Sequence, residues 1–158
     1  MFGRRHWMLP ALAAAAMLQG CSRDPDLPSH DDARDVLRLA LAFRGGELAA
    51  WRDACVVTRL RRTRVELGER VSRLDTIPHT WLPAGVRATE RADGCDRTLV
   101  YSAPRFVNVG YTQGDVAVVT IEGICKGDCA SHGSIGYHRP EGAAEWTLLD
   151  YAETGIVL

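Results

Sequence analysis

Residues 116–124, "VAVVTIEGI", decide the fold, because no other stretch of the chain has such clear strand character. The stretch is rich in β-branched side chains, which pack well on a pleated sheet. Further strands are predicted around it, at 97–102, 105–110, 134–139 and 146–151. Short turns link them at 111–115, around Gly114, and at 140–145. Consecutive strands with short links predict an antiparallel meander of about four to five strands.

An amphipathic helix is predicted near the start of the domain, from Asp31 to Arg44. Ser29 precedes it as a helix-start residue, and Gly45 and Gly46 end it. Apolar residues recur at three- and four-residue spacing along one face, at Val36, Leu37, Ala40, Leu41 and Phe43. We therefore expect an α+β fold, in which this N-terminal helix packs on the inner face of the meander.

The middle of the chain is less regular. Residues 47–54 are predicted to form a second short helical piece that places Trp51 in the core. The alternation in 55–62 predicts a strand. Residues 72–85 are expected to form a short helix or turn, which Pro78 and Pro83 interrupt. We expect Trp81, in the same stretch, to fill space in the core.

Four arginines, at positions 59, 61, 62 and 64, cluster at and beyond the predicted strand 55–62. Such a cluster is typical of a site for phosphate or an acidic ligand. It is also typical of the solvated face of an edge strand, where charge discourages pairing with other chains. Acidic residues nearby favour the solvated face.

Residues 1–20 have the features of an export signal. Arg4, Arg5 and His6 precede the charge-free run 7–18, "WMLPALAAAAML". A basic start, a short apolar run and a small residue before the cut are typical of a secretory signal. Twelve residues rise only about 18 Å as a helix, too short for a hydrocarbon core of about 30 Å. The alternatives are an uncleaved membrane anchor and a start codon further along the chain.

The end of this run, "LQGC" at 18–21, resembles the lipobox of bacterial lipoproteins. The resemblance implies that the chain is cut before Cys21, which then carries a diacylglycerol thioether. Ser22, in place of an aspartate, resembles the sorting signal for the outer membrane of a Gram-negative cell. We therefore expect the chain to have three segments: a lipoprotein signal peptide (1–20), a flexible tether (21–30) with two prolines, and a single globular domain (31–158).

Four cysteines remain if Cys21 carries lipid: Cys55, Cys95, Cys125 and Cys129. An even number in an oxidising compartment favours disulfides, and three connectivities are open. Gly127 in "CKGDC" permits a tight turn that would join Cys125 to Cys129, which leaves Cys55 to pair with Cys95.

Two alternatives use the same loop. Cys125, Cys129 and His132 are soft ligands that suit copper or zinc, although a structural zinc site usually has four ligands. The two cysteines could also cycle as a redox pair, for which the usual spacing has two intervening residues, not three.

A second resemblance covers 102–150, about a third of the chain. It has a Ser-x-Pro-x-Phe start, an Ala-Val-rich strand, a Cys-Gly loop, an aromatic strand flanked by glycine and a closing tryptophan. This pattern is similar to that of a family of uncharacterised exported bacterial proteins. The resemblance implies a shared sheet and a bridged loop, and it implies no activity.

The net charge and the absence of known motifs argue against several classes of function. The mature chain has twenty acidic and seventeen basic residues, which argues against nucleic acid bound by bulk charge. No catalytic or phosphate-binding motif is present, so we expect neither an enzyme nor a cofactor. We expect a lipid-anchored interaction module of the envelope, anchored in the outer membrane and facing the periplasm. It would act like an inhibitor or immunity protein and occlude a periplasmic protein partner with the loop 125–133. The alternatives are a metal- or thiol-handling protein and a structural lipoprotein.

Overall fold

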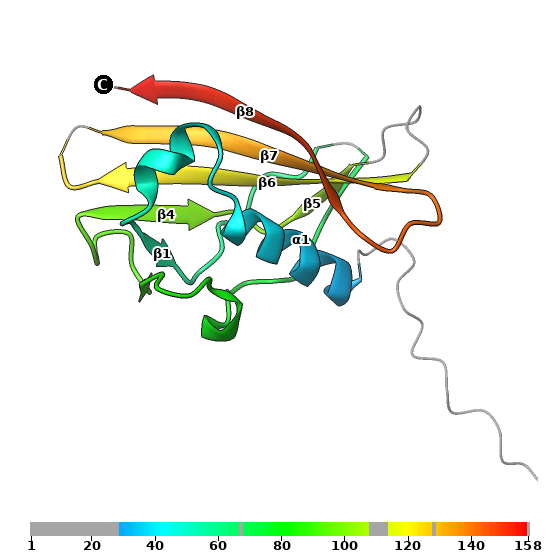
Figure 1. The fold of residues 1–158 in the computed structure, drawn as a ribbon, viewed down its shortest axis with the longest axis horizontal. Coiled ribbons are helices and arrows are strands. Elements are labelled where there is room, and N and C mark those ends of the chain that lie inside the picture. Colours follow the sequence, from blue (N-terminus) through cyan, green and yellow to red (C-terminus); the bar gives the residue numbers. More distant parts are fainter. Residues whose placement is uncertain (1–28, 67, 108–113, 128, 158) are drawn as a thin grey trace, which may run out of the picture.

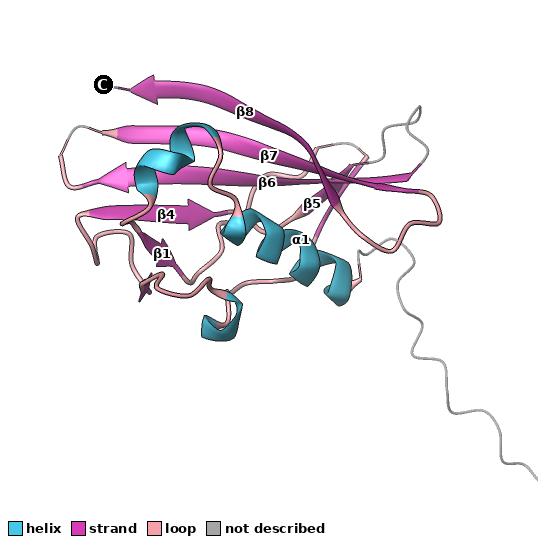
Figure 2. Cartoon of the chain, in the orientation of Figure 1, coloured by secondary structure: helices cyan, strands magenta, loops and turns pink. Residues whose placement is uncertain are grey.

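The computed structural model describes residues 29–66, 68–107, 114–127 and 129–157 (Figure 1). These ranges contain one α-helix, α1 (His30–Ala42), and two 3-10 helices, η1 (Gly46–Trp51) and η2 (His79–Trp81). They also contain eight strands, which form one sheet (Figure 2). The strands are β1 (Cys55–Val57), β2 (Glu69–Val71), β3 (Ala88–Thr89), β4 (Arg97–Tyr101), β5 (Arg105–Val107), β6 (Gly114–Cys125), β7 (Ala130–Pro140) and β8 (Thr147–Val157).

The strand β6 organises the sheet. One of its edges pairs with β7, which pairs in turn with β8, and both pairings are antiparallel. Its other edge carries β4 and β5 end to end, since Tyr101 pairs with Ile121 and Arg105 pairs with Val118. Three residues, 102–104, face only two residues of β6 between these pairs, which gives the local irregularity of a β-bulge. Outside β5 lies β2, antiparallel to it.

The expected α+β fold, with a helix on an antiparallel meander of four to five strands, is wrong. The structure is mostly β, and its eight strands form a curled, mixed sheet (Figure 1). β1 runs parallel to both β4 and β3, because the chain returns to the sheet in the same direction after a long connection. β2 and β3 have three and two residues, too few to show an alternating pattern. The predicted strand 55–62 ends at Val57 and continues only as isolated bridges at Arg59 and Arg61.

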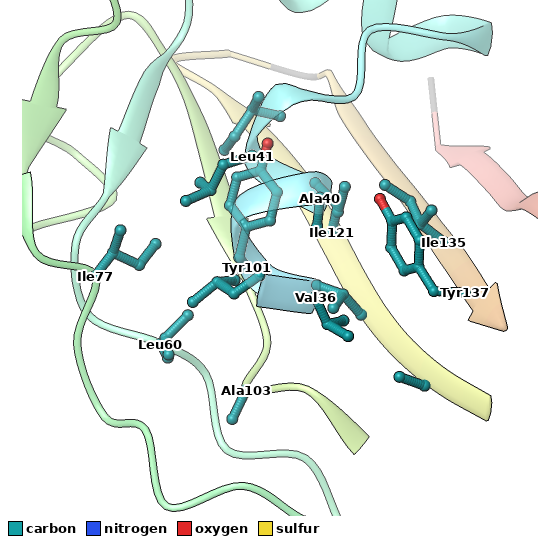
Figure 3. Close-up of a cluster of buried hydrophobic side chains, with 14 of the residues drawn as sticks. Val36, Ala40, Leu41, Leu60, Ile77, Tyr101, Ala103, Ile121, Ile135 and Tyr137 are labelled. Carbon is teal, nitrogen blue, oxygen red and sulfur yellow. The ribbon is translucent and has the colours of Figure 1, made fainter. Parts of the chain in front are cut away.

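The predicted helix is confirmed as an element. Ser29 caps α1, since its hydroxyl accepts a hydrogen bond from the Asp32 amide at 3.0 Å. The apolar stripe of α1 is buried against the sheet (Figure 3). The labelled core residues are Val36, Ala40, Leu41, Leu60, Ile77, Tyr101, Ala103, Ile121, Ile135 and Tyr137. No helix of the described ranges is long and apolar enough to span a membrane.

A short helical piece that buries Trp51 is also confirmed, as η1. The Trp51 ring lies against β6 at Gly123, where an added Cβ would stand 2.6 Å from the ring. Glycine is therefore required there for close packing rather than for an unusual backbone angle. The Arg97 guanidinium covers the ring with its central carbon 4.4 Å from the centroid. Trp81, by contrast, is only half-buried at the edge of the core.

Candidate functional site

A groove opens between α1 and the turn that joins β7 to β8. Asp35, Arg38 and Leu39 line it from α1, and residues 144–146 line it from the turn. Its volume is about 440 Å³. We call it the α1–β8 groove. Two segments more than a hundred residues apart in the sequence thus form its two walls.

An ion cluster joins the two walls of this groove through Asp32 of α1 and Trp146 of the turn. Arg139, on β7, pairs with Asp32 of α1 and, at 2.7 Å, with Asp115 of β6. The same guanidinium stacks on the Trp146 ring, 4.6 Å from its centroid. Phe106 meets the other part of this ring edge-on, with centroids 5.7 Å apart. A single arginine therefore joins α1, two strands and the β7–β8 turn; we call these five residues the Arg139 cluster.

The electrostatics of the cluster favour its charged form. Burial opposes ionisation of Asp32, but hydrogen bonds from Arg139 and Ser29 and the positive charge of Arg139 outweigh it. The pKa of the Asp32 carboxyl therefore lies below its ordinary value. Burial likewise disfavours the Arg139 cation, and bonds to Asp32 and Asp115 outweigh this, so the pKa of Arg139 is raised. At neutral pH the cluster holds its charges and the groove keeps its shape.

Large apolar side chains are exposed beside the groove. Leu39 projects into it from α1, and Leu148 and Leu149, on β8, are 53% and 58% exposed. Leu148 pairs with the buried Tyr137, and directly opposed residues share one face of a sheet. Leu148 thus lies on the face that α1 covers. Leu149 is the extra residue where the pairing shifts, so both leucines reach solvent.

The charges around the groove are mostly acidic. Asp35 and Glu145 line it, against Arg38, and Asp35 is already paired with Arg34 at 2.9 Å. Within the described ranges neither Arg38 nor Glu145 makes an ion pair. The groove therefore offers one unpaired charge of each sign on opposite walls, with a leucine and a tryptophan between them.

A second groove lies between the segments 58–62, 75–76 and 90–91, with a volume of about 700 Å³. We call it the arginine groove. Three guanidinium groups line it together with two carboxylates and two threonines. The lining residues are Thr58, Arg59, Leu60, Arg62, Asp75, Thr76, Glu90 and Arg91.

The cysteines predicted to pair do so. Cys55 is joined to Cys95 and Cys125 to Cys129, with Cα atoms 6.2 and 5.4 Å apart. Both bridges lie at the end of the sheet away from the Arg139 cluster, because Arg97, two residues after Cys95, pairs with Cys125. The Lys126 amide also donates to the Asp96 carbonyl at 2.8 Å.

The copper or zinc alternative needs Cys125, Cys129 and His132 together, and the structure places both sulfurs in a disulfide. His132 lies on β7, opposite Glu122. No group of three or more metal-ligating side chains occurs in the part of the chain that the structure describes. Cys21, the predicted lipid site, lies outside the described residues.

Comparisons of the chain with protein-family models, with curated proteins and with solved structures give no match. The function proposed below therefore rests on the sequence, the fold and the two grooves. Sequence reasoning missed the α1–β8 groove because its walls are distant along the chain. One signal pointed to it: Leu39 is apolar, but it lies off the buried stripe of the helix.

Proposed function

We propose that this chain is a lipid-anchored interaction module of the bacterial envelope, which binds an extended segment of a protein partner in the α1–β8 groove. It would act like an inhibitor or an immunity protein, because the bound segment of the partner would no longer be accessible to other molecules. The observation that carries the proposal is a groove beside an edge strand, which Leu39 and Trp146 line together with two carboxylates and one guanidinium. This assigns binding to the α1–β8 groove instead of the loop 125–133.

Sequence supports the anchor. The basic start, the short apolar run and the lipobox-like "LQGC" end at Cys21. Each buried methylene of an attached lipid contributes about 0.8 kcal/mol, so several acyl chains hold a protein firmly at a membrane. The anchor is placed in the outer membrane, with the domain in the periplasm, on account of Ser22.

The edge strand β8 supports an extended ligand. Within the described ranges β8 pairs with β7 and with no other strand, so its outer edge is where a further strand could add. The Tyr151 amide already donates to the Asp150 carboxylate at 2.8 Å and is not counted among the groups that would pair. Added strands gain main-chain hydrogen bonds, and pockets for alternate side chains give specificity. The α1–β8 groove, with Leu39 on its wall and Leu148 beside it, provides such a pocket.

Charge selects the kind of segment. The sequence of β8 is acidic and has no basic residue, so the β8 strand of a second copy would offer it no opposite charge. The groove itself has two acidic residues, Asp35 and Glu145, against one basic residue, Arg38. A partner strand that alternates apolar and basic residues complements both features. We therefore commit to a basic, apolar strand of another protein as the occupant.

The anchor is tested in growing cells with labelled palmitate. The wild-type protein is expected to take up label and to stay with membranes, and Cys21→Ser to lose both. An unlabelled wild-type protein, or a Cys21→Ser variant that remains attached as firmly, contradicts the anchor.

The groove is tested with the whole mature chain from residue 21, carrying Cys21→Ser. The probe is an eleven-residue peptide that alternates valine and lysine. We expect it to slow hydrogen exchange at amides of β8, and Leu148→Asp to weaken its binding about five- to tenfold, because an apolar contact is lost. Val65→Asp is the matched control, since Val65 is 54% exposed and far along the chain from the groove.

Three outcomes contradict the proposal. The peptide leaves β8 exchange unchanged, or both aspartate variants weaken binding equally, or sedimentation shows that the chain pairs with itself without peptide.

A further inference from the structure

We propose that the arginine groove is a separate site that binds phosphate groups, carried either by an anionic lipid headgroup or by a soluble phosphate compound. This goes beyond the partner-binding groove, with which it shares no residue.

The charge of the region supports an anion. Residues 59–91 carry eight arginines and four acidic residues, a net charge of +4. The rest of the mature chain carries −7. A domain with an acidic total has therefore gathered its positive charge in one connection between β1 and β4. Such local fields attract anions even where the net charge of the protein does not.

The walls of the groove are held by the backbone. The Leu60 amide donates to the Asp75 carbonyl at 2.9 Å, and the Ile77 amide donates to the Thr58 carbonyl at 2.7 Å. The Thr58 amide donates to the Thr89 carbonyl at 2.8 Å and so joins the third wall. The segments that carry the arginines are thus held together before any ligand arrives, which lowers the cost of ordering on binding.

The three guanidinium groups of the arginine groove have N–H donors that the existing ion pairs do not use. Arg59 makes no ion pair within the described ranges. Arg62 uses Nε and one Nη on a single oxygen of Asp75, at 3.2 and 2.7 Å. Arg91 forms a fork with Asp93, at 3.0 Å for each bond. Each guanidinium has five N–H donors, so all three can make further bonds.

The existing ion pairs are exposed and therefore weak. The side chains of Arg62 and Arg91 are about four-fifths exposed. Exposed pairs of this kind are easily exchanged. The oxygens of a phosphate suit the planar guanidinium fork, so a phosphate competes with Asp75 and Asp93 for these groups.

One carboxylate, that of Glu90, opposes anion binding, and its removal gives a direct test of the proposal. Glu90 lines the groove and has no ion pair within the described ranges. Its charge repels an anion. Removing that charge should strengthen phosphate binding, whereas removing Arg59 should weaken it.

The lipid source rests on the proposed anchor at Cys21. Ser29 lies eight positions after Cys21, a span of at most about 28 Å, so an anchored domain stays close to the headgroups. The experiment uses the mature chain with Cys21→Ser, which has no lipid of its own. Its outcome is therefore independent of whether the anchor exists.

In one arm, the protein is floated with vesicles of phosphatidylglycerol and phosphatidylcholine, and with phosphatidylcholine alone. In the other, glycerol phosphate is titrated while arginine Nε signals are followed by NMR. Either phosphate source should bind, and added salt should weaken binding. Arg59→Gln and Arg91→Gln should each weaken binding about two- to fivefold, and Glu90→Gln should strengthen it by a similar factor.

Arg52→Gln is the matched control: Arg52 is exposed and lines neither groove, so phosphate binding should not change. Vesicle binding identifies a lipid headgroup as the source, and a response to glycerol phosphate alone identifies a soluble compound. The proposal is overturned if neither source binds. It is also overturned if Arg59→Gln and Glu90→Gln act in the same direction, or if Arg52→Gln weakens binding as much as Arg59→Gln while all variants unfold at the wild-type temperature.

Discussion

One end of the sheet carries both disulfides, and the other end is held by the ion pairs and stacked rings of the Arg139 cluster. Covalent bonds at the first end hold the chain in the same way at any pH or salt concentration. The second end depends on charge and burial, and it borders the α1–β8 groove. The difference indicates that one end of the sheet is fixed covalently, whereas the end that carries the proposed binding groove is held by ion pairs and burial.

The largest effect is expected at the long bridge. The double variant Cys55→Ala/Cys95→Ala should lose about 4 kcal/mol of unfolding free energy, because the bridge closes a loop of forty residues. Cys55 is also fully buried. Guanidinium unfolding at neutral pH measures the change. A loss below about 1 kcal/mol would show that this end does not depend on its covalent link.

The Arg139 cluster should come next. Arg139→Met should cost about 2–3 kcal/mol, because it leaves Asp32 and Asp115 partly buried without their cation. The same unfolding experiment measures it. Arg34→Met is the matched control: its pairs with Asp31 and Asp35 are more exposed and should contribute less than about 1 kcal/mol. Equal losses from the two variants would remove the special role given to Arg139.

The short bridge should matter less. Cys125→Ala/Cys129→Ala should cost about 2 kcal/mol, since the loop it closes has a sequence separation of four. Because Cys129 is exposed and Cys55 is buried, a thiol reductant should open the short bridge first. Mass spectrometry of alkylated intermediates follows the order. Reduction of Cys55–Cys95 first would reverse the relation between the two bridges.

The smallest effect is a dependence on pH. The folded-state pKa of Asp32 is lowered, so its stabilisation is complete above the ordinary value near 3.9. It is lost as the pH falls through the lower folded value. Asp32→Asn should therefore lose less stability than the wild type below pH 4. Unfolding curves at several acidic pH values decide this, and parallel curves for the two proteins would contradict it.

The helix α1, the strand β6 and both disulfides could be predicted from the sequence. Local signals found α1 through Ser29 and its apolar stripe, and they found β6 through its β-branched run. The cysteine spacing around Gly127 correctly predicted the short bridge, and elimination gave the long one. These features rest on neighbours in the chain.

The rest depends on contacts between distant residues. β2 and β3 are too short to have a pattern, and the parallel pairing of β1 with β4 follows the long connection 58–96. Arg139 and Asp32 are 107 positions apart, and nothing near either residue indicates the other. Nearby acidic residues favour a solvated face for the four arginines at 59–64, and the sequence does not show that Arg91 joins Arg59 and Arg62 in one groove.

The central claim is that the end held without covalent bonds is the binding face. A photo-crosslinking amino acid placed at Leu148, in the full chain in living cells, tests it most directly against the same group at Lys126 in the bridged loop. We predict a discrete adduct from position 148 that Leu39→Asp abolishes and Val65→Asp retains, and no such adduct from position 126. An adduct from position 126 alone, or one at position 148 that Leu39→Asp leaves unchanged, would contradict the account.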